Sequence, residues 1–292
     1  MPNELNQDDI DTLKRDGICL KSAFFSHETV DVLRTASLTL REFAPVPKRP
    51  SRRWILRSPV DGIRKSLNSD SRRAIYQISR VIGDSGFRRS SELFFRAPVE
   101  LDHIMSIESP VSDEPITKWH TDSNSRSDHP DSFTLKFFIY LNSIDESNGA
   151  FAYVRGTQSI VTVIRQGIFE GRVEYVPTGS VAELLTAVSD SAVSKYLNEH
   201  VSECDLELFR QNLLELNDQQ AGDRRHDLVG PAGTLLVFDD RGVHRGGVPR
   251  VGPRSILRVN YMATQFAPSV KSRKLRDDVA KMLLRGPMRN HW

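Results

Sequence analysis

Apolar residues recur at helical spacing in the first part of the chain. Residues 5–42 carry apolar side chains three or four positions apart, as in Val30, Leu33, Ala36 and Leu40. This spacing predicts helices, with Ser26 as the N-cap of the second one. Gly17 interrupts the pattern, and the apolar residues 18–20 predict a short strand between the two helices. Residues 71–82 predict a further helix.

From residue 92 onward the pattern changes to short apolar segments bounded by turn residues. These segments are 93–95, 101–105, 133–141, 150–154, 234–238 and 255–262. Many short strands separated by turns are typical of a sandwich or jelly roll and not of βαβ units. The sequence therefore predicts a mainly β fold with flanking helices, while residues 181–217 return to helical spacing.

These patterns predict one domain that spans residues 1–292. A helical and basic flank covers 1–92, the jelly-roll strands cover 93–154 and 226–265, and a C-terminal helix or tail covers 266–292. A mostly helical insertion at 155–225 separates the two groups of strands. The insertion and the arginine-rich segment 44–70, which is expected to be an irregular loop, are candidate lids.

Composition excludes several classes of protein. The chain has 292 residues, of which 38% are hydrophobic and 27% are charged, so it can bury a sizeable core and is not a disordered protein. Its longest apolar runs fall well short of the roughly 18 residues that a membrane span needs. The N-terminus is polar and acidic, and the two cysteines form no spacing motif. We therefore expect a cytoplasmic protein that does not insert into membranes.

The formal net charge of +2 conceals an uneven distribution. Residues 41–96 contain 14 Lys and Arg against 5 Asp and Glu, whereas residues 100–149 contain 10 Asp and Glu against 3 Lys and Arg. Both stretches fit ordinary solvated surfaces. Alternatively, the basic stretch could attract an anionic small-molecule substrate, and the acidic stretch could supply a carboxylate to a bound ion.

The segment Trp119-His120-Thr121-Asp122 carries the most informative motif. In an extended chain, positions i and i+2 point to the same side, so His120 and Asp122 can reach a single ion. His244 follows the apolar segment 234–238 and is the candidate third ligand. Two histidines and one carboxylate form the facial triad of non-haem Fe(II) oxygenases. The sequence thus predicts His120, Asp122 and His244 as metal ligands and catalytic residues.

Further candidates would line a pocket around this triad. Arg254 lies ten residues after His244 and opens a strand, where its guanidinium can clamp a carboxylate in a bidentate manner. Arg258 shares the same strand face. The other residues that we expect near a substrate or cofactor are Trp119, Lys136 and His103.

Taken in order, these motifs resemble the phytanoyl-CoA dioxygenase family. The resemblance rests on His120-x-Asp122, residues 136–141, the turn at 148–151, and His244 with Arg254, and it covers residues 100–262. It implies a double-stranded β-helix, which is a cupin-like jelly roll. It also implies Fe(II) held by the three predicted ligands, 2-oxoglutarate held by Arg254, and O₂ as co-substrate.

The resemblance implies an enzyme that oxidises a small organic substrate and releases succinate and CO₂. Related iron halogenases carry a small residue in place of the carboxylate, so Asp122 favours hydroxylation over halogen transfer. One departure lies after the Asn-Gly turn, where the family usually continues Val-Pro-Gly-Ser-His and this chain reads Val-Arg-Gly-Thr-Gln at 154–158.

Two alternatives from other classes remain open. The first is a non-catalytic metal-binding jelly roll that acts as a sensor or binding module. The second is a nucleic-acid-directed protein that uses the basic stretch 41–96. The second is less favoured, because the aromatic residues of this stretch are scattered and it contains no nucleic-acid-binding motif.

Overall fold

A computed structural model describes residues 4–43, 46–47, 52–56, 69–122, 129–218 and 224–266. Within these ranges the strands form two sheets in which every pairing is antiparallel. The larger sheet has the order β1 (Ile18–Lys21), β8 (Leu235–Asp239), β5 (Leu135–Tyr140), β10 (Arg254–Ala263), β4 (Val99–Ser109), β3 (Arg52–Leu56) and β2 (Val46–Pro47). The smaller sheet has the order β7 (Asp227–Leu228), β6 (Phe151–Tyr153) and β9 (His244–Gly246).

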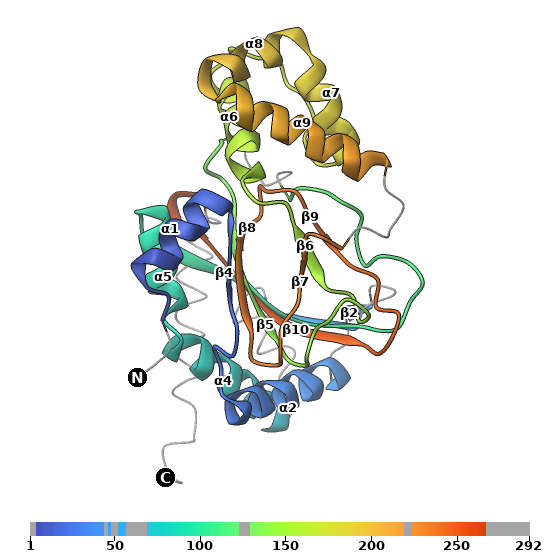
Figure 1. Ribbon diagram of the computed structural model, residues 1–292. Helices are drawn as coiled ribbons and strands as arrows, with labels where there is room; N and C mark the ends of the chain where they lie inside the picture. The colour runs from blue at the N-terminus through green and yellow to red at the C-terminus, as the bar shows by residue number, and fades with distance from the viewer. Residues whose placement is uncertain are drawn as a thin grey trace.

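The chain alternates between the two sheets, which is the connectivity of a jelly roll. It passes from β5 in the larger sheet to β6 and β7 in the smaller one, then to β8, β9 and β10 in alternate sheets (Figure 1). Phe138, Phe151 and Phe238 meet between the sheets with ring centroids 4.6–5.2 Å apart. The predicted double-stranded β-helix is thus confirmed.

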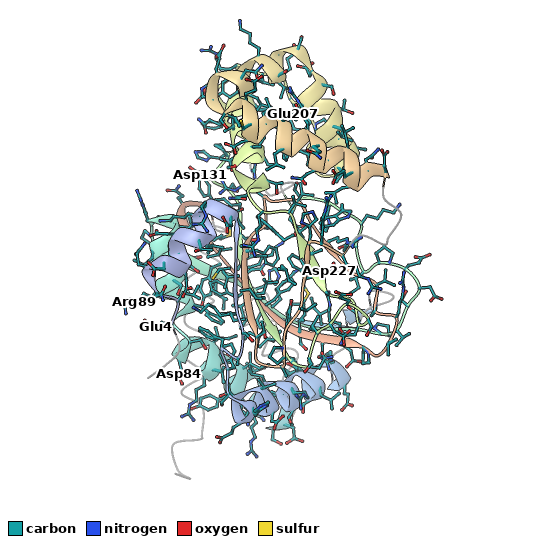
Figure 2. The ribbon with its side chains drawn as sticks, viewed as in Figure 1. Glu4, Asp84, Arg89, Asp131, Glu207 and Asp227 are labelled. Carbon is teal, nitrogen blue, oxygen red and sulfur yellow. The ribbon has the colours of Figure 1, made fainter. Side chains whose placement is uncertain are left out.

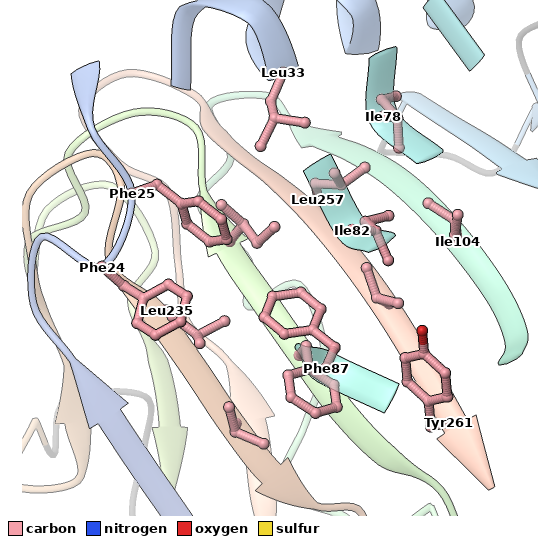
Figure 3. Close-up of a cluster of buried hydrophobic side chains, with 14 of the residues drawn as sticks. Phe24, Phe25, Leu33, Ile78, Ile82, Phe87, Ile104, Leu235, Leu257 and Tyr261 are labelled. Carbon is pink, nitrogen blue, oxygen red and sulfur yellow. The ribbon is translucent and has the colours of Figure 1, made fainter. Parts of the chain in front are cut away.

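Four helices cover the outer face of the larger sheet: α1 (Gln7–Asp16), α2 (His27–Phe43), α4 (Ser69–Asp84) and α5 (Phe87–Phe95). Their apolar side chains form one core with the outward-facing residues of β5, β8 and β10 (Figure 3). Because both faces of β5 are covered, all six of its residues are buried. This explains its nearly continuous apolar sequence, in which Lys136 is the exception.

The start and end of α1 follow from local chemistry. Asn6 and Asp9 form a capping box at its N-terminus. Gly17 ends the helix with φ at 76°, a left-handed conformation that favours glycine. A Cβ at this position would lie 2.3 Å from the hydroxyl oxygen of Tyr153. Gly17 therefore lets the turn between α1 and β1 approach the smaller sheet closely.

The segment between β6 and β7 forms a helical unit at one end of the two sheets (Figure 1). It contains α6 (Thr157–Phe169), α7 (Val181–Ser189), α8 (Ser191–His200) and α9 (Glu203–Asp218), which share a core of their own. None of the helices in the described part of the chain has the length and apolar character that a bilayer crossing requires.

The structure corrects three details of the sequence analysis. Residues 93–95 belong to helix α5 and not to a strand, because Phe87, Ser90 and Ser91 form one buried helical face. Residues 52–56, expected in an irregular loop, pair with β4 as strand β3. The long helices also make the helical share larger than a mainly β class implies. A short 3-10 turn, η1 (Thr264–Phe266), follows β10, and the predicted C-terminal helix lies outside the described residues.

A substitution at Phe87 tests the core between the larger sheet and the four helices that cover it. Its ring is fully buried and stacks on Phe137 of β5 with centroids 4.4 Å apart. We expect Phe87→Ala to lower the free energy of unfolding by about 3–5 kcal/mol, measured by denaturant titration. Leu93→Ala on the same helix is the matched control, because Leu93 is 43% exposed, and it should cost less than about 1 kcal/mol. Equal losses in the two variants would contradict this core.

The smaller sheet contains a buried acid–base pair. Asp227 of β7 and Arg245 of β9 both lie opposite Ala152 of the central strand β6. Their Oδ1 and Nη2 atoms are 3.7 Å apart, and each side chain is 8% exposed (Asp227 is labelled in Figure 2). Burial raises the pKa of Asp227 to about 6, although Arg245 and Arg224 oppose this shift. The folded protein thus binds a proton here more tightly than the unfolded chain does.

This shift predicts a pH dependence of stability. Because the pKa of Asp227 is raised on folding from 3.8 to about 6, its stabilising contribution is complete below pH 3.8 and is lost as the pH rises through 6. Asp227→Asn cannot ionise, so the stability of this variant relative to wild type should increase between pH 4 and 7 by up to about 2 kcal/mol. Denaturant titrations across this range measure the difference. Parallel profiles for the two proteins would refute the raised pKa.

Candidate active site

Backbone hydrogen bonds bring the two histidines of the predicted triad together. The N–H of His120 donates to the carbonyl oxygen of His244 at 2.9 Å, and the N–H of His244 donates back at 2.8 Å. The residues after His120 are also anchored, because the N–H of Asp122 donates to the carbonyl oxygen of Asp240 at 2.9 Å. The segment that holds His120 thus lies along β9 as an additional edge of the smaller sheet.

The helical unit supports the same segment from its other side. Thr121 donates its N–H to the carbonyl oxygen of Gly179 at 3.2 Å and its hydroxyl to that of Thr178 at 2.8 Å. Ser180, the N-cap of α7, forms a backbone bridge with His120. The insertion predicted as a lid therefore contacts the triad directly through the loop that precedes α7.

The donor set fits a divalent metal ion. Each histidine donates Nδ1–H to a backbone carbonyl, His120 to Lys118 at 2.7 Å and His244 to Gly242 at 2.8 Å. These bonds leave Nε2 of both rings as the ligand atom, in the manner typical of metal-binding histidines. The Nε2 atoms lie 3.4 and 3.7 Å from the carboxylate oxygens of Asp122. The candidate ligand atoms all lie within 4.8 Å of one another.

Electrostatics favour the protonation states that a metal requires. Burial raises the pKa of Asp122, but the charge of Lys136 and the polar contacts with His120 and His244 outweigh it, so the net pKa is lowered. Burial lowers the pKa of His244. An ionised carboxylate and a neutral imidazole are the forms that bind metal ions.

Lys136 lies between two carboxylates beside the triad. Its ammonium group contacts Oδ2 of Asp122 and lies 3.4 Å from Oδ2 of Asp240. Asp240 also accepts hydrogen bonds from the backbone and hydroxyl of Thr134. Lys136 therefore holds one oxygen of Asp122 in place and leaves Oδ1 toward His120.

A cavity of about 750 Å³ extends from the triad between the two sheets. Arg254, Arg258 and His103 line it together with Lys136, as predicted for a pocket, while Met105, Phe138 and Ile256 provide apolar walls. Arg254 is buried, and its Nη1 donates to the carbonyl oxygen of Gly149 at 3.1 Å. The structure thus brings the predicted cation and the predicted ligands to one cavity.

Trp119 is the exception among the predicted pocket residues. It does not line this cavity but packs against the apolar core of the helical unit. Its indole also packs under the guanidinium of Arg245, whose carbon lies 4.7 Å from the ring centroid.

Among the cavity residues that the sequence did not predict are the polar side chains of Asp102, Asp240 and Asn260. Asn260 carried a usable signal, because it continues the i, i+2 alternation of Arg258 on the same strand. Asp240 follows the apolar segment 234–238, but nothing local indicates that it meets Lys136.

Comparison with known proteins shows the fold. No protein-family model matches the sequence, and no curated protein sequence matches it. Among solved structures, EctD from S. alaskensis with bound Fe is similar with a TM-score of 0.56 and 15% identity, over 89% of this chain and 78% of that chain. The non-haem α-ketoglutarate-dependent carbocyclase SnoK from nogalamycin biosynthesis has a TM-score of 0.55 and 14% identity, over 93% and 90% of the two chains.

A third similar structure is HygX from Streptomyces hygroscopicus with nickel and 2-oxoglutarate bound. Its TM-score is 0.51 and its identity 13%, over 90% of this chain and 89% of that chain. The likeness spans nearly the whole chain, which therefore has the jelly-roll fold of these proteins. The resemblance read from the sequence motifs agrees with this fold.

Removal of a predicted ligand tests the metal centre without any assay of turnover. We expect Asp122→Ala to lower the affinity for Co(II) by more than about 100-fold, measured by calorimetry and by the visible absorption of the bound ion. His200→Gln on α8 is the matched control, since His200 lies on the helical unit and contacts Tyr196. If Asp122→Ala bound Co(II) as tightly as wild type, the assignment of these ligands would be wrong.

Proposed function

We propose that the protein is a non-haem Fe(II)- and 2-oxoglutarate-dependent dioxygenase that hydroxylates a small organic substrate. The observation that carries the proposal is the convergence of His120, Asp122 and His244 at the wall of a cavity that also contains a buried arginine, Arg254. Two imidazoles and one carboxylate leave open coordination positions for a co-substrate and oxygen. The similar folds of proteins with bound Fe or 2-oxoglutarate support the same assignment.

The residues of the chain have distinct roles in this proposal. His120, Asp122 and His244 hold Fe(II), and Arg254 pairs with the distal carboxylate of 2-oxoglutarate. When bound, the metal, 2-oxoglutarate and O₂ would supply the oxidising chemistry, with 2-oxoglutarate converted to succinate and CO₂. Lys136 orients Asp122, and the apolar walls of the cavity exclude water from the reacting groups.

The reaction type rests on the ligand set. Asp122 occupies the position at which related halogenases have a small residue, so transfer of an oxygen atom is favoured over transfer of a halogen. The similarity to SnoK, a carbocyclase, indicates that this fold also serves other oxidations. Identification of the reaction product therefore tests whether the substrate is hydroxylated.

Ion pairs formed by the basic stretch 41–96 weaken the alternative of a nucleic-acid-directed protein. Several of its described arginines pair with carboxylates, as in Arg41 with Glu108, Arg88 with Glu92, and Arg89 with Glu4 (the last pair is labelled in Figure 2). These pairs compensate part of the positive charge. Steering of an anionic substrate by this stretch stays a prediction.

Anaerobic absorption spectroscopy and succinate release test the function together. Addition of Fe(II) and 2-oxoglutarate should produce a visible charge-transfer band, and admission of O₂ should release succinate. His120→Ala should lose both signals. Arg254→Gln should retain Fe(II) but weaken 2-oxoglutarate by about tenfold or more, because a charge-assisted bidentate contact is lost.

The same measurements separate the oxygenase from a metal-binding sensor. A sensor would bind Fe(II) through the triad without the charge-transfer band and without succinate release. That result with the wild-type protein would overturn the proposed function while leaving the metal centre in place.

A further inference from the structure

One wall of the cavity carries a polar group of side chains that the proposed chemistry does not use. Asp102 and His103 of β4 and Arg258 and Asn260 of β10 all line the cavity, and we call them the β4–β10 wall. The two strands are neighbours in the larger sheet, and His103 lies directly opposite Asn260. The wall therefore forms one continuous surface inside the jelly roll.

An irregularity in strand pairing creates this surface. Asn260 pairs with His103 and Tyr261 pairs with Leu101, so Asp102 has no residue opposite it. In a regular strand Asp102 and His103 would point to opposite faces, but a β-bulge re-aims a side chain. Here both side chains line the cavity, and Oδ2 of Asp102 lies 2.7 Å from Nδ1 of His103.

The hydrogen bonds of the wall determine the role of each group. Arginine can only donate, so Nη2 of Arg258 donates to Nε2 of His103 at 2.8 Å. Nδ1 of His103 is then the protonated nitrogen and donates to Asp102. Burial, with the charges of Arg258 and Lys136, lowers the pKa of His103, in agreement with a neutral ring. The imidazole thus fixes the orientation of the guanidinium and separates it from the carboxylate.

Asn260 has an acceptor that lacks a donor. The residue is 2% exposed, and its Oδ1 has no hydrogen-bond partner among the residues that the structure describes. A buried acceptor without a donor is unfavourable, so a donor from a bound molecule would stabilise it. Asn260 lies opposite Lys136 on β5, and Lys136 contacts Asp122 of the triad. Asn260 lines the cavity, so its side chain lies close to the candidate metal ligands.

Two arginines on one strand define two separate anion sites. Arg254 and Arg258 share a face of β10, but four residues of a strand span about 13 Å. Under the proposed function, the distal carboxylate of 2-oxoglutarate pairs with Arg254. Arg258 is a second cation on the wall of the cavity, beside Asn260 and near the triad.

We propose that the β4–β10 wall binds the primary substrate through a carboxylate and a nearby hydrogen-bond donor. This inference rests on the proposed function. The guanidinium of Arg258 pairs with the carboxylate, and Oδ1 of Asn260 accepts an N–H or O–H of the same molecule. A monoanion fits better than a dianionic phosphate, because Asp102 lies only one imidazole away from Arg258. The apolar remainder of the substrate packs against Met105 and Phe138.

The test uses the full chain loaded anaerobically with Fe(II) and saturating 2-oxoglutarate. Equilibrium dialysis measures the binding of 3-hydroxyhexanoate, of 3-hydroxyhexanamide, which lacks the charge, of hexanoate, which lacks the donor, and of hexyl phosphate. We expect 3-hydroxyhexanoate to bind most tightly. Arg258→Gln should weaken it by about tenfold or more, and Arg258→Lys should restore only part of this loss.

Two variants make the assignment specific. Asn260→Leu should remove the difference in affinity between 3-hydroxyhexanoate and hexanoate, because only the former offers a donor to Oδ1. Arg254→Gln is the matched control and should weaken 2-oxoglutarate more than the probe, whereas Arg258→Gln should weaken the probe more than 2-oxoglutarate. Thermal unfolding of each variant checks that the fold is retained.

Several results would overturn the substrate assignment. These are the absence of probe binding at about 10 mM, equal binding by wild type and Arg258→Gln, displacement of the probe by 2-oxoglutarate, and tighter binding of hexyl phosphate. Each of them leaves the charge-transfer band of Fe(II) and 2-oxoglutarate intact. Loss of that band in wild type would instead overturn the proposed function, and dialysis with the metal-free protein would still test the wall.

Discussion

The two backbone hydrogen bonds between His120 and His244 are the contact on which the site depends. They join a segment that precedes β5 to strand β9, which comes after the whole helical unit. The ligand atoms therefore come together only when the two sheets pack around their apolar interior. Gly242 allows this closure, because a Cβ at its position would lie 1.9 Å from the hydroxyl of Tyr153. Packing of the smaller sheet and assembly of the site are thus one event.

The cost of burying charge explains why the charged side chains around the triad contact one another. Asp122, Lys136 and Asp240 lie in contact beside two buried or half-buried histidines. Taking charges out of water is costly unless they are paired and hydrogen-bonded. Both carboxylates accordingly contact Lys136, and Asp240 also accepts hydrogen bonds from Thr134. Such an arrangement stabilises the fold only weakly, and its value lies in holding ligand atoms at defined positions.

The candidate metal ligands and the proposed substrate wall belong to different strands and loops of the fold. The likeness to EctD, SnoK and HygX covers about nine-tenths of this chain at 13–15% identity, so the jelly roll persists while nearly all side chains differ. Fold alone does not specify a substrate. The candidate ligands come from the loop before β5 and from β9, whereas the polar wall comes from β4 and β10. A change in the wall can therefore alter recognition without disturbing the triad.

The periodicity of the sequence determined the positions of most helices and which residues share a face of a strand. The i, i+2 alternation placed His120 with Asp122 and Arg254 with Arg258, and helical spacing located α1, α2, α4 and α7–α9, because both periods depend only on neighbouring residues. Strand pairing is non-local, and only the tertiary structure decided it. The pairing of residues 52–56 with β4, the bulge that turns Asp102 inward and the outward position of Trp119 are set by which strands become neighbours and in which register.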